Sequence, residues 1–449
     1  MALVEGGQAV LLVGYVDACR ACRLDYSACK PVARANFQER SRRTGLMQPL
    51  ADLKVLDLTW HVAGPYCTKL LGDYGADVIK VERPLTGDPS RSYGPFPQDV
   101  PHVERSGAFL HLNTNKRSVT VNLKDAAGRG IILQLARWAD VVVENFSPGT
   151  LAGLGLGYEA LAEANPRLVL CSISNFGQTG PYRDWKATEF TLAAMAGFTY
   201  ITGVQEREPL KSADHLQEYQ GGAHGALAIM GAVLRQQEEG AGEAIDVSIF
   251  EVAVGSPDRR GTYLSAYAYT GLDGKRESPL GGALPLGMFP CKDGFINIVV
   301  SPPGRWPRFL EMLGRGDLVH DPEIRRPGYW ATPAARELVD TLLYPWLIER
   351  TKQEVFDAAQ SARIAAAPLN TPTQVLTEPH LQARGYFVRA SHPAAGPLPY
   401  TGPSFRMEGE GWMLRSTAPL LGQHNQEVLG GMLGLSGAEM AVLRETGAI

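Results

Sequence analysis

Short apolar runs alternate with helical segments between residues 53 and 173, and this alternation restricts the possible folds more than any other feature. Helices are predicted between the runs: one is opened by Pro65 at a favoured first-turn position, one covers Ala126–Trp138, and one starts at Pro148. Repeated strand–helix–strand units of this spacing predict a doubly wound parallel sheet with right-handed crossovers. The runs that have the length and β-branched content of buried strands are VLDL (55–58), DVIKVE (77–82), SVTVNL (118–123), DVVVENF (140–146) and residues 168–173.

The length of 449 residues allows two or three domains, each with a core of its own. We predict a large α/β domain over 47–270, preceded by a poorly ordered lead over 1–46. Gly and Pro become frequent near SPLGGALPLGMFPCKDG, and a strand at FINIVV (295–300) and helices near 307–313 and 332–349 follow. This pattern predicts a smaller α+β domain over 280–400. The last segment, 401–449, is predicted to return to the large domain as a helix.

Composition argues against several broad classes of protein. A hydrophobic content of 45% and a charged content of 20% are typical of a soluble globular chain. The net charge of −4 gives no support for a surface that binds nucleic acid or membrane. The longest apolar runs, Ala9–Val16 and Gly221–Leu234, are shorter than the about 18 residues that a membrane span needs. Six scattered cysteines do not resemble a disulfide framework, so a reducing cytoplasm is predicted.

Two kinds of site lack their sequence signatures. No strand–helix junction carries G-x-G-x-x-G or a P-loop, so the phosphate cradle of a dehydrogenase or an NTPase is missing. Cys19, Cys22 and Cys29 form a lone C-x2-C-x6-C, without the second ligand pair of a zinc site. We therefore predict no metal and no permanently bound cofactor.

Two carboxylates stand near the starts of consecutive helices after the run at 168–173. A turn-rich loop over 175–186 follows that run, and Glu189 and Glu218 come at the beginnings of the next two helical segments. A carboxylate at a helix start is often only a cap on free backbone N–H groups. From the residues alone, each of the two is either a cap or a functional group.

Several ordered segments together resemble one known family. They are VLDLTWHVAGPYCTKLLGDYGADVIKVERP, NTNKRSVTVNLK, VVVENFSPGTL, NFGQTGPYRD, TEFTLAAMAGF, EYQGG, GEAIDVSIFE and APLNTPTQVL. This set, spread from residue 53 toward 449, resembles the class III coenzyme A (CoA) transferase family, which also contains formyl-CoA transferase, carnitine CoA-transferase and 2-methylacyl-CoA racemase. The resemblance implies an interlocked homodimer of ring-like chains, with an acyl-CoA and a carboxylic acid as substrates.

The resemblance also implies a covalent mechanism. The nucleophilic Asp of the family, followed four residues later by Gly, falls on Glu218, four residues before Gly222. This carboxylate would attack an acyl-CoA to give a mixed anhydride, and CoA thiolate would then form an enzyme thioester. A carboxylate suits this role because it is ionised at neutral pH and its acyl derivative stays activated. Glu reaches about 1.5 Å further than Asp, and a misplacement of about 1 Å can cost about 10²-fold in rate.

Further positions follow from the same resemblance. Glu189 matches a carboxylate that positions substrate, Gly281 and Gly282 match the start of a glycine-rich loop that covers the site, and Asn145 and Phe146 match a position that holds the adenine or pantetheine arm. Ligands of doubly wound sheets gather at the carboxyl ends of the strands. The phosphates of CoA require local positive charge. Basic residues at matching positions are Lys80, Arg83, Lys116, Arg117 and Lys186.

Two alternatives to the transferase stay open. The first is a CoA-binding subunit without activity of its own, paired with a related catalytic partner, because Glu218 stands where the family has Asp. The second is a 2-methylacyl-CoA racemase, whose His position falls on Thr188 and whose Asp position falls on Glu218. Val62 replaces a polar residue of oxalate-specific members, which argues against oxalate as the acceptor. His61, His111 and His224 are candidates for a general base, but a single His on a helix is more often a packed core residue.

Overall fold

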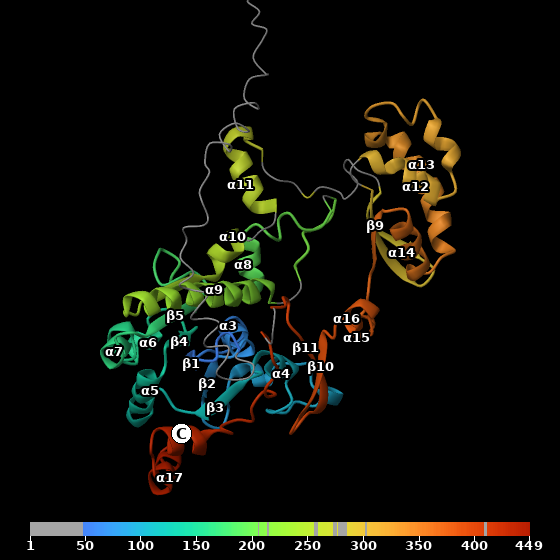
Figure 1. Ribbon diagram of the computed structural model, residues 1–449. Helices are drawn as coiled ribbons and strands as arrows, with labels where there is room; N and C mark the ends of the chain where they lie inside the picture. Colours follow the sequence, from blue (N-terminus) through green and yellow to red (C-terminus); the bar gives the residue numbers. More distant parts are fainter. Residues whose placement is uncertain are drawn as a thin grey trace, which may run out of the picture. The chain divides into compact units, whose positions relative to one another are not determined.

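Six parallel strands form the central sheet, in the order β3-β2-β1-β4-β5-β6 (Figure 1). The strands are β1 (Lys54–Asp57), β2 (Asp77–Glu82), β3 (Lys116–Thr120), β4 (Val141–Glu144), β5 (Val169–Ser174) and β6 (Ala244–Ser248). The helices between them are α3 (Ala63–Asp73), α4 (Gly107–Leu112), α5 (Ala126–Trp138), α6 (Thr150–Gly153), α7 (Tyr158–Ala164), α8 (Glu189–Met195) and α9 (Leu216–Glu239). The predicted doubly wound parallel sheet is therefore confirmed.

The computed structural model describes residues 48–204, 206–212, 215–255, 259–272, 276, 285–300, 303–407 and 411–449. The predicted lead over 1–46 and the predicted glycine loop at Gly281 and Gly282 lie outside these residues.

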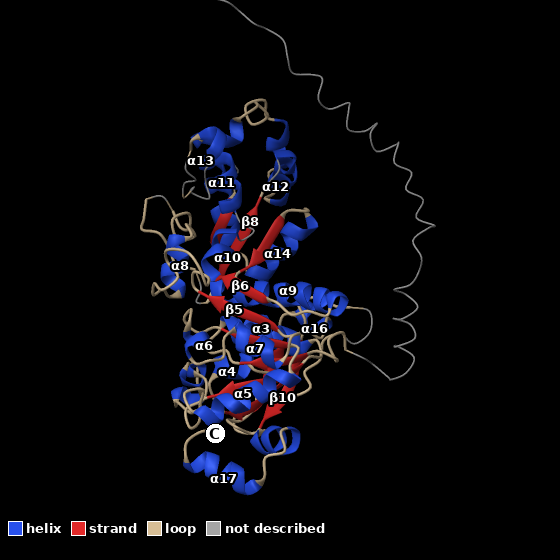
Figure 2. Ribbon diagram, turned by 90° about the vertical axis from the view of Figure 1, so that its left-hand side faces the viewer, coloured by secondary structure: helices blue, strands red, loops and turns tan. Residues whose placement is uncertain are grey.

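Alternation along the strands builds two cores, one on each face of the sheet. Val55 and Val141 point into a core shared with α3 and α9, whereas their neighbours Leu56 and Val142 point into a core shared with α5 and α7. Both faces of the sheet are thus apolar, as the near-continuous hydrophobic runs in the sequence require. Figure 2 shows α9 alongside β5 and β6 on one of these faces.

The strand order reverses between β1 and β4, and one side chain ties the two strand ends together. The Asn145 side chain, just after β4, accepts a hydrogen bond from the Trp60 N–H at 2.8 Å and donates one to the Trp60 carbonyl at 2.7 Å. In open α/β sheets a ligand crevice forms at this point of reversal. The fold therefore indicates where a site should be sought.

Six charged side chains form what we call the inner charge cluster: Asp57, Lys80, Glu82, Asp88, Arg91 and Lys116. All are buried, and they pair as Lys116 with Asp57 at 3.0 Å, Lys80 with Asp88 at 2.8 Å, and Arg91 with Glu82 at 2.7 Å. Burial alone would raise the pKa of Asp57, but Lys116, Lys80 and two threonine hydroxyls lower it to about 2. Asp57 therefore stays ionised inside the protein.

Strand β3 begins and ends earlier than the predicted 118–123. It covers Lys116–Thr120, and the Asn122 N–H donates to the Ala448 carbonyl at 2.8 Å. The C-terminal segment, with helix α17 (Gly437–Glu445), packs into the core on the α5 and α7 face of the sheet. Val428, Leu429, Met440 and Ile449 are buried there with Leu135 of α5.

A second set of elements forms a three-stranded antiparallel sheet with helices packed on it. The strands are β7 (Leu286–Cys291), β8 (Gly294–Val299) and β9 (Ala365–Pro368), and the helices are α12 (Trp306–Met312), α13 (Pro333–Ile348) and α14 (Lys352–Ser361). The other elements are α10 (Ile249–Gly255), α11 (Arg259–Thr270), α15 (Pro372–Leu376), α16 (Pro379–Ala383) and the hairpin β10 (Phe387–His392) and β11 (Gly396–Thr401). None of the helices within the described ranges combines the length and the apolarity needed to cross a membrane.

Candidate active site

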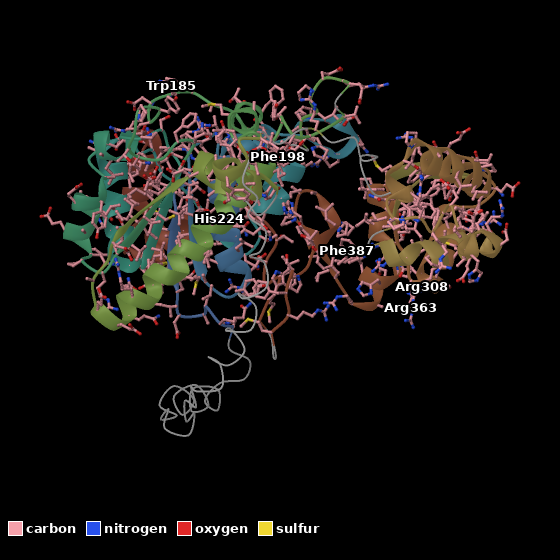
Figure 3. The ribbon with its side chains drawn as sticks, turned by 90° about the horizontal axis from the view of Figure 1, so that it is seen from above. Trp185, Phe198, His224, Arg308, Arg363 and Phe387 are labelled. Carbon is pink, nitrogen blue, oxygen red and sulfur yellow. The ribbon has the colours of Figure 1, made fainter. Side chains whose placement is uncertain are left out.

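A cavity of about 700 Å³ opens at the carboxyl ends of β4 and β5. Its wall also includes the first residues of α8 and α9 and the loop between β5 and α8. Trp185 lies on this loop, and His224 lies farther along α9 (Figure 3). The cavity is next to the Trp60–Asn145 contact, so it occupies the place that the strand order indicates. Among the residues that line it are His61, Tyr93, Asn145, Phe146, Arg183, Lys186, Glu189, His215 and Glu218.

Close packing of α9 on α3 fixes the place of Glu218. A Cβ atom on Gly222 would lie 2.3 Å from the Ala63 carbonyl oxygen, and one on Gly225 would lie 2.9 Å from the Ile173 side chain. Glycine at position 222 thus lets α9 approach the backbone of α3, and glycine at position 225 lets it approach β5. The glycine four residues after the carboxylate thus sets the first turn of α9, and Glu218 with it, against the cavity.

Glu189 caps the helix that carries Glu218. Its two carboxylate oxygens accept the backbone N–H groups of Gln217 at 3.1 Å and Glu218 at 3.2 Å. Its own helix α8 is capped instead by Thr188 and Thr191. Burial raises the pKa of Glu189, the two N–H bonds oppose this rise, and the charge of Glu218 adds to it. Glu189 is therefore a cap and a member of the cavity wall at the same time.

The carboxylate of Glu218 reaches the cavity and contacts a histidine. Its Oε2 lies 2.6 Å from Nδ1 of His215, and the two side chains are 23% and 42% exposed. Over the residues that the structure describes, the other oxygen, Oε1, accepts no hydrogen bond. Glu218 thus lines the cavity with one carboxylate oxygen bonded to His215 and the other without a hydrogen bond to the described residues.

A second polar pair faces the same cavity. Nδ1 of His61 lies 2.5 Å from the Tyr93 hydroxyl, and the backbone N–H of His61 donates to Asp88 of the inner charge cluster at 3.1 Å. Burial raises the pKa of Tyr93, and the negative charge of Glu218 raises it further. Tyr93 therefore remains a hydroxyl donor near the carboxylate. We call His61, Tyr93, Glu189, His215 and Glu218 the cavity cluster.

A group of aromatic and cationic side chains, which we call the aromatic and cationic wall, lies beside the cavity; Phe146 lines the cavity, whereas Trp60 and Arg83 are outside its lining. The rings of Trp60 and Phe146 meet edge to face at 5.1 Å, and the Arg83 guanidinium lies 4.7 Å from the centre of the Trp60 ring. Lys186 and Arg183 line the cavity and are exposed. Asn145 lines it too, although its amide is occupied by Trp60.

Of the five basic residues singled out from the sequence, Lys186 lines the cavity and the other four do not. Lys80 and Lys116 have fully buried ammonium groups, paired with Asp88 and Asp57, and neither can contact a ligand in this arrangement. Arg117 is bonded to Asp77 and Glu427 at 2.7 Å each. Lys116 and Arg117 open β3, so they lie at the amino end of that strand rather than at its carboxyl end.

The three histidines considered as bases differ in their surroundings. Burial and the charge of Lys69 lower the pKa of His111 to about 4, so it is a neutral, partly buried residue outside the cavity lining. His224 is bonded to the Gln220 carbonyl on its own helix at 2.8 Å, and only His61 lines the cavity. His215 was not singled out from the sequence, although its spacing of three residues from Glu218 at a helix start is a recognisable signal. No group of three metal-binding side chains occurs within the described part of the chain.

Known proteins share both the sequence pattern and the fold. The model of CoA-transferase family III matches residues 50–425. The chain is similar to succinate–glutarate CoA-transferase of Agrobacterium fabrum, with 31% identity over 396 residues, which covers 85% of this chain and 95% of that protein. It is also similar to formyl-CoA:oxalate CoA-transferase of Streptomyces avermitilis, with 32% identity over 423 residues, which covers 90% of this chain and 100% of that protein.

Solved structures give the same result. A CaiB/BaiF family protein from Brucella suis has a TM-score of 0.74 and 30% sequence identity to the chain, and the match covers 86% of this chain and 99% of that one.

Proposed function

The chain belongs to CoA-transferase family III, and from this premise we propose that it moves CoA from an acyl-CoA to a carboxylic acid with Glu218 as the nucleophile. The observation that carries the proposal is the position of Glu218, whose carboxylate lines a cavity large enough for the thioester end of a CoA ester. The side chain is partly exposed and one of its oxygens is available for attack.

The proposed reaction needs no proton transfer. Oε1 of Glu218 adds to the thioester carbonyl, the C–S bond breaks, and CoA leaves as the thiolate from a mixed anhydride. The thiolate then adds to the Glu218 carbonyl carbon and expels the donor acid as its carboxylate, which leaves CoA on the enzyme as a thioester. The acceptor carboxylate attacks the carbonyl carbon of this thioester, the C–S bond breaks, and CoA thiolate leaves from a second mixed anhydride. The thiolate then attacks the acceptor carbonyl carbon, which gives the acceptor acyl-CoA and restores the Glu218 carboxylate.

The aromatic and cationic wall supplies groups for the rest of the CoA molecule. We propose that Phe146 and Trp60 contact the adenine or the pantetheine arm, and that Arg83, Arg183 and Lys186 contact phosphate groups. Arginine over an aromatic ring, as Arg83 is over Trp60, can hold a phosphate by a bidentate hydrogen bond while its plane stays stacked. Lys80 and Lys116 are left out of this site because of their burial.

A trapping experiment tests the proposal. The protein is incubated with succinyl-CoA, treated with hydroxylamine or borohydride, and digested for peptide mass mapping. We expect a modified Glu218 in the wild-type protein and none in Glu218→Gln, while Glu239→Gln, at the exposed far end of α9, should be modified at Glu218 like the wild type. CoA binding without a modified peptide would contradict the transferase and favour a binding subunit, and α-carbon deuterium exchange without an adduct would favour a racemase.

We also propose that the protein is a cytoplasmic homodimer. The thiols Cys67 and Cys171 are buried and unpaired, which fits a reducing compartment. Large apolar side chains are exposed on two helices: Leu227 and Leu234 on α9, and Leu264, Tyr267 and Tyr269 on α11. A second copy would cover such surfaces. Light scattering after gel filtration should give twice the mass of the chain.

A further inference from the structure

We propose that His215 is a positioning residue: it holds the carboxylate of Glu218 where the shorter aspartate of the family would place its own. This inference rests on the proposed role of Glu218. A glutamate in place of an aspartate gains a rotatable bond and about 1.5 Å of reach, so its carboxylate needs a constraint that the shorter side chain does without. The contact of 2.6 Å between His215 Nδ1 and Glu218 Oε2 supplies this constraint.

Glu218 is held at both of its ends. Its backbone N–H donates to Glu189 at 3.2 Å, which fixes the start of the side chain, and His215 holds Oε2 at the far end. An ionised carboxylate can only accept hydrogen bonds, so the bridging proton belongs to Nδ1 of His215. With Oε2 engaged, Oε1 is the oxygen left for attack on a thioester in the cavity. The pair therefore decides which oxygen attacks and from which direction.

The backbone holds His215 itself in place. Its φ is 65°, a left-handed conformation, and its carbonyl accepts the Tyr219 N–H at 2.9 Å, which is the first hydrogen bond of α9. A residue in this position cannot follow the helix, so its side chain is turned back over the first turn toward Glu218. Left-handed backbone at non-glycine residues concentrates at functional sites.

The same bond also serves the second step of the proposed reaction. When the thiolate adds to the Glu218 carbonyl carbon, negative charge develops on the oxygen of that carbonyl. A donor already placed at that oxygen stabilises the charge without reorganisation, as donors of an oxyanion hole do. An exposed ion pair on an ordinary helix surface would have neither consequence, since it faces bulk water. Both His215 and Glu218 line the 700 Å³ cavity.

The test compares two replacements that both tolerate left-handed backbone. His215→Gly removes the side chain, and His215→Asn keeps an amide donor. We expect His215→Gly to lower kcat by about 10- to 100-fold with an unchanged KM for the acyl-CoA, and His215→Asn to recover most of the loss. His224→Asn, on the same helix but bonded to a backbone carbonyl away from the cavity, is the matched control and should have wild-type kinetics.

A cycle with Glu218→Asp separates positioning from a general structural effect. In the aspartate background the carboxylate no longer reaches His215, so the further change His215→Gly should slow adduct formation by less than about 3-fold. Equal losses in both backgrounds, or equal losses in the Gly and Asn variants, would overturn the inference. If wild-type Glu218 forms no adduct at all, the proposed function fails, whereas a normal adduct rate in His215→Gly removes only the role of His215.

Discussion

The inner charge cluster and the cavity cluster lie beside the same sheet but are built in opposite ways. Asp57 and Lys116 have completely buried side chains, and each carboxylate oxygen of Asp57 is engaged by a neighbour. Glu218 and His215 are partly exposed and line the cavity, and among the described residues only Oε2 of Glu218 accepts a hydrogen bond. The charges of the inner cluster have only protein partners and stabilise the fold, whereas under the proposed function Glu218 keeps one carboxylate oxygen for the reaction.

The largest expected effect is on activity alone. Glu218→Gln keeps the size of the side chain but removes the nucleophile, so CoA transfer should fall by at least about 10³-fold. The free energy of unfolding, measured by urea denaturation, should stay within about 0.5 kcal/mol of wild type because the side chain is a partly exposed one. A large loss of stability would show that the cavity cluster also stabilises the fold, which would contradict the contrast with the inner charge cluster.

A change in the inner charge cluster should instead lower the free energy of unfolding. Lys116→Met leaves the buried Asp57 carboxylate without its cation, and such a removal costs about 3–5 kcal/mol. Arg117→Met is the matched control at the next position, because its ion pairs with Asp77 and Glu427 are partly exposed and should be worth less than about 1 kcal/mol each. Equal losses in the two variants, in the same urea denaturation, would mean that burial does not distinguish these pairs.

The free energy of unfolding should depend on pH through Asp57 of the inner charge cluster. The pKa of Asp57 is lowered from 3.8 to about 2 in the folded protein, so its charged form stabilises the fold by about 2 kcal/mol. This contribution is complete above pH about 4, which is the unfolded pKa, and is lost as pH falls through about 2. Urea denaturation between these values should show a steeper loss of stability for the wild type than for Asp57→Asn. Parallel curves would contradict an ionised Asp57.

A smaller effect is expected where a residue is both cap and cavity wall. Glu189→Gln keeps one acceptor oxygen, so one of the two backbone N–H bonds at the start of α9 is lost. A hydrogen bond to a charged group is worth about 1.5 kcal/mol or more, so kcat should fall by about 10-fold. Hydrogen exchange at the Glu218 amide should become faster as well. If kcat falls while that exchange stays unchanged, Glu189 acts on the substrate rather than through the helix.

The smallest effect concerns ligand binding. Phe146→Ala removes the edge-to-face contact with Trp60 and one aromatic wall of the cavity. Aromatic contacts of this kind are worth about 0.5–1.5 kcal/mol, so the KM for acyl-CoA should rise a few-fold with little change in kcat. Phe295→Ala, at an exposed position of β8, is the control. Equal KM values for the two variants would exclude Phe146 from the CoA site.

The strands and helices of the sheet could be predicted because local signals coincide with tertiary ones there. The predicted strand at 77–82 and helix over 126–138 have the bounds of β2 and α5, since the first is a continuous buried run and the second starts after the Asp125 cap. The helix predicted near 332–349 is α13, opened by the Thr332 cap and the proline after it. The prediction placed the end of β3 three residues too late. Just beyond the observed end, the Asn122 N–H donates to the Ala448 carbonyl, and no local sequence pattern reveals a contact between residues so far apart in the chain.

The site was harder to predict for a physical reason. Glu189, Glu218, Phe146 and Lys186 could be selected by position, and the structure brings them to one cavity. Whether a lysine faces a ligand or a buried carboxylate depends on partners elsewhere in the chain: Lys116 meets Asp57, which is 59 positions away. Lys116 opens β3 and Lys186 lies in the loop before α8, but this difference of position does not reveal that Asp57 is the partner of Lys116, so the sequence alone could not separate the two lysines.

The double hydrogen bond between Asn145 and Trp60 has a mechanical consequence. It joins the segments that follow β1 and β4, just beyond the backbone pairing of these two strands, and so adds to the contacts that hold the two halves of the sheet together. On another side the cavity is bounded by the loop before α8, whose residues from Thr179 to Lys186 are exposed. Changes of acyl-chain selectivity should accordingly be sought by varying the length of that loop, while the frame around Asn145 is kept intact.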